Sequence, residues 1–459
     1  MKKAIVFSKS LLIIGLVIAV LQTGCRKEIE PVVLTSEELL SAKADEARSI
    51  LNVSDSYVVE SWYNLLNRLI ISTPGQTPPI AAREIGYIGI ALYEAAAGGL
   101  FLHPSLAGQL NGLSSLPRRQ PRRLYIHQVS ANASLARIIK SLFGNASAAN
   151  IASIDSLESA NYRLHAFKFS VGIMNLSRDF GYAIGDAIFE WSKTDGGHQA
   201  YLNVFPATYI PTAGSGLWVP TPALFQPAML PYWGSNRNFV PGNNPGEVDP
   251  PAPPSFSTIT NSKFYREAYK VFKTVNNLTQ EQKDIANYWA DGSGTFTPPG
   301  HNISMAVQLI RNKNLGLGQA SVLLAAIGIA LNDAAIVCWR CKFNFNLLRP
   351  VTYIKTYIDP NWTSYIGTPP FPAYTSGHST FSGATAKILS LRFGNHFAFT
   401  DSTKVPYGIA PRSFKSFEQA AREAARSRLY GGIHYEFDND EGLRCGILIG
   451  NNVAKLKWQ

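Results

Sequence analysis

The chain has 459 residues, of which 46% are hydrophobic and only 16% are charged. This composition supplies a large apolar core and excludes a disordered chain, and the length corresponds to about three units of ~150 residues. The formal charge of +11 falls to +8 without Lys2, Lys3 and Lys9, which lie in a segment that we expect to be removed. A moderately basic protein favours small anions or anionic surfaces. It has no clustered basic run with interleaved aromatic residues, so a nucleic-acid partner is not indicated.

The first 24 residues are typical of a targeting signal. A positively charged start precedes an apolar run of ten residues, Leu11–Val20, which is too short to span a bilayer by itself. The run leads to Gly24 and Cys25 and resembles the cleavage box of bacterial lipoproteins, although Gln22 stands where that box usually has Leu. We therefore expect a lipoprotein signal peptide, a lipidated Cys25 that anchors the protein to a membrane, and a tether over residues 25–35. The mature protein would be exported to the cell envelope, in the periplasm or at the outer membrane. The alternative is an ordinary secretory signal in which Cys25 is incidental.

Helical periodicity dominates the N-terminal half, which we place at residues 36–257. Between about residues 194 and 257 the sequence is rich in Pro, Gly and aromatic residues and has no sustained period. We expect a long irregular segment there, and loops of this length are usually functional. The helices expected before it cover residues 36–71, 79–97, 124–142, 151–157 and 166–191.

The C-terminal half, residues 258–459, also reads as helix with almost no alternating strand pattern. Residues 317–330 are nearly free of charge, but Asn332 and Asp333 follow directly, so we expect a buried core helix rather than a membrane span. The sequence therefore predicts an all-α protein, two helical bundles joined by the irregular segment. The expected helices are 262–275, 279–290, 315–345, 376–393, 416–429 and 440–456, with capping boxes at Thr279/Gln282 and Ser416/Gln419.

Three cysteines remain after Cys25. Cys338 and Cys341 form a C-x-x-C inside the longest apolar helix, and Cys445 stands alone. An odd number does not indicate a disulfide scaffold, and the absence of a second pair in the sequence argues against a zinc site. We expect all three to behave as small buried hydrophobic residues.

Two cations follow the most apolar helix. Lys342 and Arg349 are seven residues apart, so they would project from one helix face if the helix persists as far as Pro350, which would then end it. Their position after an apolar helix favours burial beside an anion over a solvated surface. Lysine supplies a point charge there, and arginine supplies a planar fork that matches tetrahedral oxyanions.

Further polar residues follow in two short groups. Ser376, Gly377 and His378 open a helix, where free backbone N–H groups, a hydroxyl donor and an accessible glycine are suited to an anion. Arg428 comes near the end of the next helix, and His434 follows a double glycine. Each group alone has an ordinary explanation as a helix cap. Together with the two preceding cations they predict an oxyanion site.

In this order and spacing the residues resemble the three-part signature of vanadium-dependent haloperoxidases and type 2 phosphatidic-acid-phosphatase-like acid phosphatases. One position departs from the signature, because Thr375 stands where Pro is usual, and this change should affect loop rigidity more than chemistry. The three parts are Lys342-(six residues)-Arg349-Pro350, Ser376-Gly377-His378 and Ser427-Arg428-(five residues)-His434.

Three further positions are similar to the peroxidase branch. The segment 369–374 resembles the stretch before Ser-Gly-His in soluble haloperoxidases, where Phe371 would wall a halide pocket, and Trp339 matches a pocket aromatic residue. Ordinary core packing is the alternative for both rings. The segment 289–299 resembles a family stretch whose acidic residue pairs with a signature arginine, and the resemblance pairs Asp291 with Arg428.

The resemblance implies a vanadate cofactor with hydrogen peroxide and a halide as substrates, iodide first and bromide next. Lys342, Arg349 and Arg428 would neutralise the vanadate oxygens, and Ser376 and the Gly377 N–H would donate hydrogen bonds to them. His434 would be the metal ligand. His378 would contact the cofactor and take the proton of the incoming peroxide, which Lys342 would polarise. The implied catalytic set is His378, Lys342 and His434.

Two other functions use the same residues. In an acid phosphatase the pocket would hold a phosphate ester, with His434 as nucleophile and His378 as the acid for the leaving group. Membrane-bound phosphatases of the superfamily carry several spanning helices, and we expect none in this chain after residue 24. A non-enzymatic envelope lipoprotein that binds an oxyanion is the third possibility, and the two histidines argue against it.

Overall fold

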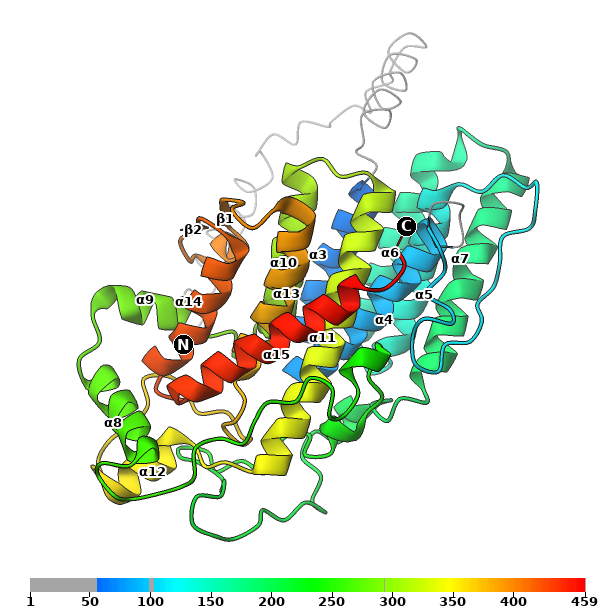
Figure 1. Cartoon of the computed structure of the whole chain (residues 1–459). Coiled ribbons are helices and arrows are strands. Elements are labelled where there is room, and N and C mark those ends of the chain that lie inside the picture. Colours follow the sequence, from blue (N-terminus) through cyan, green and yellow to red (C-terminus); the bar gives the residue numbers. More distant parts are fainter. Residues whose placement is uncertain (1–55, 99–102, 293, 459) are drawn as a thin grey trace, which may run out of the picture. The chain divides into compact units, whose positions relative to one another are not determined.

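The computed structural model describes residues 56–98, 103–292 and 294–458 (Figure 1). In these residues the sheet is limited to one antiparallel hairpin, in which β1 (Phe399–Asp401) pairs with β2 (Arg412–Phe414). The other regular elements are helical, which confirms the all-α prediction. The expected signal peptide, Cys25, the tether and the start of the helix expected over 36–71 lie outside the described residues.

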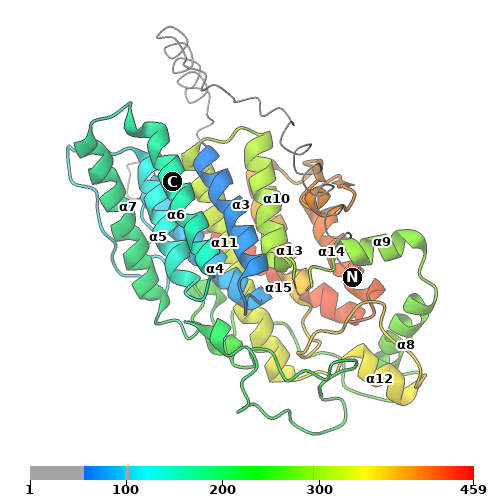
Figure 2. The same cartoon turned by 180° about the vertical axis from the view of Figure 1, so that it is seen from behind.

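The helices before the irregular segment form one side of the fold (Figures 1 and 2). Within it α4 is mostly apolar and is buried from Pro79 to Ala96, as expected for a helix in the centre of a large core, although Arg83, Glu84 and Glu94 are buried with it. Its two initial prolines, Pro78 and Pro79, occupy the first turn, where a missing N–H costs nothing. These helices are α3 (Tyr57–Ser72), α4 (Pro78–Ala96), α5 (His127–Leu142), α6 (Ala148–Ala166) and α7 (Val171–Ser192).

The expected irregular segment is confirmed. Only three single-turn 3-10 helices interrupt it in the described residues: Ala200–Leu202, Trp233–Ser235 and Pro241–Asn243. The buried carboxylate of Asp333 fixes the segment to α11, because it accepts hydrogen bonds from the backbone N–H groups of Phe239 (2.7 Å) and Val240 (3.0 Å). The polar residue that interrupts the apolar run thus anchors the loop.

The remaining helices follow in the second half of the chain. Two of them, α10 and α12, were not expected: no helix was assigned to residues 297–312, and Pro350 was expected to end a helix. In both cases Pro occupies the first turn of a new helix instead. Pro350 therefore opens a helix rather than ending one, and that expectation was wrong. The set is α8 (Lys263–Asn276), α9 (Gln280–Tyr288), α10 (Thr297–Asn312), α11 (Leu317–Phe345), α12 (Pro350–Tyr357), α13 (Gly377–Phe393), α14 (Phe417–Tyr430) and α15 (Glu436–Ala454).

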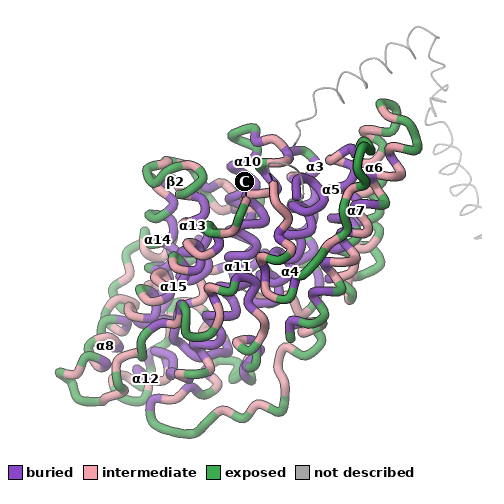
Figure 3. Tube along the Cα trace, turned by 45° about the vertical axis from the view of Figure 1, so that its right-hand side comes forward, coloured by how far each residue is buried: buried purple, intermediate pink, exposed green. Residues whose placement is uncertain are grey.

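Helix α11 is the centre of the molecule. It packs along α4 and also contacts α10, α13 and α15, and Figure 3 shows its trace buried along most of its length. By length and composition it is the one described helix that qualifies as a membrane span, but 94% of its apolar window is buried by protein, as expected for a core helix. The two helices approach closely at glycines: a Cβ on Gly89 would lie 2.8 Å from the carbonyl oxygen of Leu324.

Local signals were correct where side chains act on their own backbone. The capping box of Thr279 and Gln282 is complete. At α14 only half of the expected box forms: Ser416 caps the helix, but the Gln419 side chain accepts from the Lys415 N–H (2.6 Å) instead. The three later cysteines are free thiols and buried, as expected.

Candidate functional site

The C-terminal end of α11 delivers Lys342 into the protein interior. The side chain is fully buried, and its Nζ donates to the carbonyl oxygens of Pro372 (2.9 Å), Ala373 (3.1 Å) and Thr375 (2.6 Å). Lys342 therefore holds the turn that leads into Ser376 and places a positive charge directly behind it.

Arg349 reaches the same place by a different route from the one expected. Helix α11 ends at Phe345, Asn346 turns the chain with a φ of 45°, and Arg349 becomes the residue before α12. The two cations therefore do not share a helix face. The Arg349 Nε donates to the Phe371 carbonyl (2.7 Å), and its Nη1 donates to the Ile433 carbonyl (2.8 Å).

The second part of the signature starts α13. Ser376 is the residue before the helix, and its backbone N–H donates to the Asp438 carbonyl (2.9 Å). Gly377 has room around it, since an added Cβ would meet its nearest neighbours only at 3.8 to 4.0 Å. His378 is partly exposed as a residue, although its Nε2 is buried.

Several polar atoms of this region are buried and have no hydrogen-bond partner among the described residues. They include the Arg349 Nη2, the Ser376 Oγ and the His378 Nε2, together with the Tyr435 hydroxyl and the Asp438 Oδ1. Buried polar groups are normally paired, and leaving one unpaired costs about 1–3 kcal/mol. Donor and acceptor atoms of this kind, drawn from the first and second parts of the signature, indicate a site prepared for a polar ligand.

The third part of the signature comes from the end of α14 and the turn after it. Arg428 is buried; its Nε donates to the Ser427 Oγ (2.9 Å) and its Nη2 contacts the Ala286 carbonyl (3.3 Å). The expected ion pair with Asp291 is wrong, because the ion pairs of Asp291 in the described residues go to His301 and Lys404. The charge of Asp291 still acts on Arg428 at longer range.

His434 is held in one protonation form. Its Nδ1 lies 2.9 Å from the Asp438 Oδ2, and its Nε2 lies 3.1 Å from the Arg349 Nη1, which is a donor only. The imidazole therefore carries its proton on Nδ1, and the lone pair on its Nε2 accepts a hydrogen bond from the Arg349 Nη1. Burial, followed by the charges of Arg349 and Lys342, holds the pKa of His434 well below its ordinary value.

Asp438 was missed from the sequence. It follows His434 by four residues, and the same carboxylate oxygen also accepts from the Tyr435 N–H (3.1 Å) at the start of α15. Burial raises its pKa to about 7, against the effect of Lys342. The His-x-x-x-Asp spacing at a helix start was the available signal.

The three cations of the signature are all buried. Burial lowers the pKa of Lys342 to about 8, and the pKa values of Arg349 and Arg428 fall to about 10 for the same reason. Such shifts mark charges that have lost water without gaining full compensation. A bound anion would compensate these buried positive charges.

Two aromatic rings form the wall beside Lys342. The ring centroids of Trp339 and Phe371 are 4.9 Å apart. The Lys342 Nζ and the Arg349 Cζ each lie 4.9 Å from the Phe371 centroid, so this ring faces both cations. Both rings are buried, so they pack in the core. The same two rings would also line a pocket beside Lys342.

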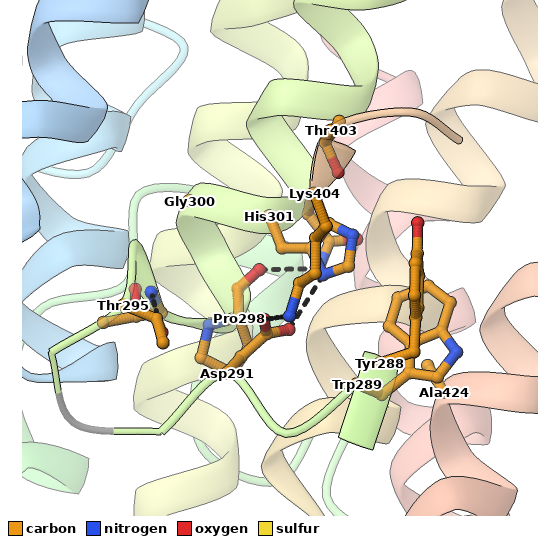
Figure 4. Close-up of polar contacts among 12 residues, drawn as sticks. Tyr288, Trp289, Asp291, Thr295, Pro298, Gly300, His301, Thr403, Lys404 and Ala424 are labelled. Atoms are coloured by element: carbon orange, nitrogen blue, oxygen red, sulfur yellow. Dashed lines mark hydrogen bonds and ion pairs between the residues drawn. The ribbon is translucent and has the colours of Figure 1, made fainter. Parts of the chain in front are cut away.

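A second polar cluster lies around Asp291 (Figure 4). It consists of Asp291, His301, Asp401 and Lys404, which are all buried. Only Asp291 was singled out from the sequence. The Pro-Pro-Gly-His run over 298–301 was the signal for His301, whereas Asp401 and Lys404 come from a distant hairpin that the sequence did not place.

Comparison with known proteins gives concordant matches. The family model described as the VCPO second helical-bundle domain matches residues 322–458. Vanadium chloroperoxidase of Curvularia inaequalis is 32% identical over 215 residues, which cover 33% of this chain and 35% of that enzyme, so the match spans about a third of its length.

The solved structures cover far more of the chain. A structure described as the first bacterial vanadium-dependent iodoperoxidase has 32% identity and a TM-score of 0.80, and the alignment covers 88% of this chain and 96% of that one. A holo-type bacterial vanadium-dependent chloroperoxidase has 18% identity and a TM-score of 0.64, over 83% and 92% of the two chains, and shows likeness of fold alone.

Proposed function

The chain belongs to the vanadium-dependent haloperoxidases, and we propose that it binds vanadate and oxidises a halide, with iodide preferred, to hypohalous acid using hydrogen peroxide. The observation that carries the proposal is the group of unpartnered buried atoms on Arg349, Ser376 and His378.

The residues fit a tetrahedral oxyanion. The Arg349 Nη2 and the Ser376 Oγ are free donors, Gly377 leaves space for a ligand near its backbone, and Lys342 and Arg428 add charge. The lone pair on the His434 Nε2 is the kind of ligand that transition metals accept from imidazole. Bound vanadate supplies an electrophilic metal centre that activates hydrogen peroxide.

The protein groups have separate tasks in this reaction. Burial, followed by the charge of Arg428, holds the pKa of His378 well below its ordinary value, so the ring is neutral near pH 7. A neutral Nε2 accepts a proton from hydrogen peroxide in the pocket. Asp438 orients His434, and Lys342 supplies positive charge while holding the turn before Ser376.

Iodide is proposed as the first halide because it is the most easily oxidised of the three. The similarity to an iodoperoxidase at 32% identity over 88% of the chain supports this choice. Bromide is the next candidate, and chloride comes last because it is the hardest of the three to oxidise.

Reconstitution tests the proposal. Metal-free protein should oxidise no iodide with hydrogen peroxide, added vanadate should restore the reaction, and phosphate should compete with vanadate for the same cations. Vigorous hydrolysis of phosphate esters without vanadate-dependent iodide oxidation would contradict the proposal and favour the acid phosphatase. Binding of phosphate without either reaction would favour an oxyanion-binding protein.

We also propose that the protein is an exported lipoprotein attached to the cell envelope through Cys25. The support is the apolar run 11–20 followed by Gly24 and Cys25 in the sequence.

A further inference from the structure

The cluster around Asp291 joins three pieces of chain (Figure 4). His301 comes from α10, Asp291 from the loop after α9, Asp401 from β1 and Lys404 from the turn after β1. The His301 Nδ1 lies 2.8 Å from the Asp291 Oδ2, and the His301 Nε2 lies 2.9 Å from the Asp401 Oδ2. Lys404 forms an ion pair with the other oxygen of Asp291.

Hydrogen bonding assigns the protonation state of His301. An ionised carboxylate only accepts hydrogen bonds, whereas a neutral imidazole has a single N–H. The other oxygen of Asp401 accepts from the N–H (2.9 Å) and Oγ1 (2.7 Å) of Thr403, which favours its ionised form. Both ring nitrogens of His301 must then be donors, so the ring is an imidazolium. Burial alone would lower the pKa of His301, but the two carboxylates raise it to about 9.

The four charges cancel. Two carboxylates face one imidazolium and one ammonium, so the buried cluster is neutral as a whole. Burial alone would raise the pKa of Asp291, but His301 and Lys404 hold it far below its usual range. Asp291 is thereby kept as a carboxylate in the protein interior.

The ring of His301 is also fixed by packing. It stacks on Trp289 at a centroid distance of 4.8 Å and an interplanar angle of 26°, and Phe296 meets it edge-on at 5.5 Å. The Trp289 Nε1 donates to the Glu423 Oε1 (3.0 Å) on α14, the helix that carries Arg428. The cluster is therefore bound to the helix that supplies one wall of the oxyanion pocket.

The charge of Asp291 reaches the pocket. It favours the protonated forms of both Arg428 and His378, although it is not ion-paired with either, while the charges of Lys404 and His301 act on His378 in the opposite direction. Asp291 also adopts a left-handed backbone conformation, with a φ of 42°, which is unusual for a residue other than glycine. The side chain thus needs partners that hold it in place.

We propose that His301 is a positioning residue for the oxyanion pocket: as a permanent imidazolium between Asp291 and Asp401, it fixes the charge that Asp291 presents to Arg428 and His378. The expected effect on turnover rests on the proposed function. The protonation state of His301 does not depend on that function.

The first test is a double-mutant cycle with His301→Gln and Asp291→Asn, read as kcat/KM for hydrogen peroxide after vanadate reconstitution. Each single change should lower the value by about 10- to 100-fold, as for other groups that orient a metal-site residue. If His301 acts through Asp291, adding His301→Gln to Asp291→Asn should change the value by no more than about twofold. The proposal would be overturned if the two losses in kcat/KM multiplied in the double variant, or if His301→Gln left kcat/KM unchanged.

Two variants make this cycle secure. His127→Gln is the matched control, because the His127 Nδ1 lies 2.7 Å from a backbone carbonyl oxygen, that of Ala96, and no carboxylate partner is among its described contacts, so the activity should not change. If His301→Gln does not fold, Asp401→Asn takes its place in the cycle, since it removes the second carboxylate and keeps an acceptor oxygen. The same non-additivity with Asp291→Asn is expected.

The second test needs neither vanadate nor turnover. In ¹⁵N spectra of metal-free protein at about pH 8, both ring nitrogens of His301 should be protonated, because the pKa of the ring lies at about 9, whereas an ordinary histidine is neutral there. A singly protonated His301 would refute the imidazolium. If the unmodified protein showed no vanadate-dependent activity, the proposed function would be refuted. The ¹⁵N measurement would still decide the protonation state of His301.

Discussion

At the scale of single residues, the candidate site is defined by cations that are buried in the protein interior. The pKa of Lys342 falls to about 8, and Asp438 fixes the proton of His434 on Nδ1. The sequence identified every signature residue, because their types and spacing are local properties. It did not identify Asp438 or the true partners of Asp291, since these depend on which elements meet in space.

Replacing Asp438 should remove the group that orients His434, the proposed metal ligand. Asp438→Asn removes the carboxylate that accepts from the His434 Nδ1, so we expect vanadate affinity to fall by about 10- to 100-fold while the protein stays folded. Equilibrium dialysis with metal analysis measures this affinity. Asp440→Asn, an exposed position on the same helix, is the control, and equal affinities in the two variants would contradict the assignment.

Anion binding should depend on the protonation of Lys342. The pKa of Lys342 is about 8 in the metal-free protein, and the anion binds the charged form. Affinity should therefore be retained below this pH and fall by up to about tenfold per pH unit above it, one proton being taken up on binding. Sulfate is a suitable probe for calorimetry, because its own charge is constant in this range.

Lys342→Met provides the comparison for that titration. It should bind sulfate more weakly than the unmodified protein and should lose the decline above about pH 8, because the titrating group is gone. A decline that persists unchanged in Lys342→Met would assign the dependence to another group.

At the scale of elements, the helix predictions differ from the structure at prolines and at bends of the chain. The sequence placed α4, α5, α11 and α13 within a few residues because their apolar periods are long. It missed α10, and it missed α12 because Pro350 was read as a breaker, although Pro also starts helices. Lys342 and Arg349 meet because the chain turns at Asn346, a left-handed residue that no periodicity reveals.

The close crossing of α4 and α11 should be sensitive to a single methyl group. A Cβ on Gly89 would lie 2.8 Å from the Leu324 carbonyl oxygen and 3.0 Å from the Ala325 Cα, so Gly89→Ala must push two backbones apart. We expect a loss of about 1–3 kcal/mol in the free energy of unfolding, measured by denaturant titration.

Gly172→Ala on α7 is the matched control. An added Cβ there meets no described atom within 4 Å, and alanine is the better helix former, so stability should be unchanged or slightly higher. Equal stabilities of the Gly89 and Gly172 variants would show that the α4–α11 crossing is not tightly packed.

At the scale of the whole molecule, the described residues form one compact unit. One continuous apolar cluster contains residues of α3, α4 and α5 together with residues of α10, α11 and α13. Periodicity finds helices one at a time and does not show which of them share a core. The long irregular segment is part of this unit, since Asp333 and Arg340 of α11 both bind it.

Attachment to a membrane is a separate property of the chain start. Cys25→Ser should move the protein from the membrane fraction to the soluble envelope fraction, because it removes the residue that would carry the lipid. Fractionation and the intact mass of the mature protein measure this. An unmodified mass, or membrane association that survives the substitution, would contradict the lipoprotein proposal.

The most direct test of the account is the vanadium content of reconstituted protein after gel filtration, compared between the unmodified chain, His434→Ala and His378→Ala. His434 presents a lone pair on Nε2, so its removal should abolish vanadium retention. His378 contributes an acid–base group, so its variant should keep stoichiometric vanadium and lose turnover. Retention of vanadium by His434→Ala together with its loss from His378→Ala would contradict the assignment of the two histidines and the geometry on which the proposed function stands.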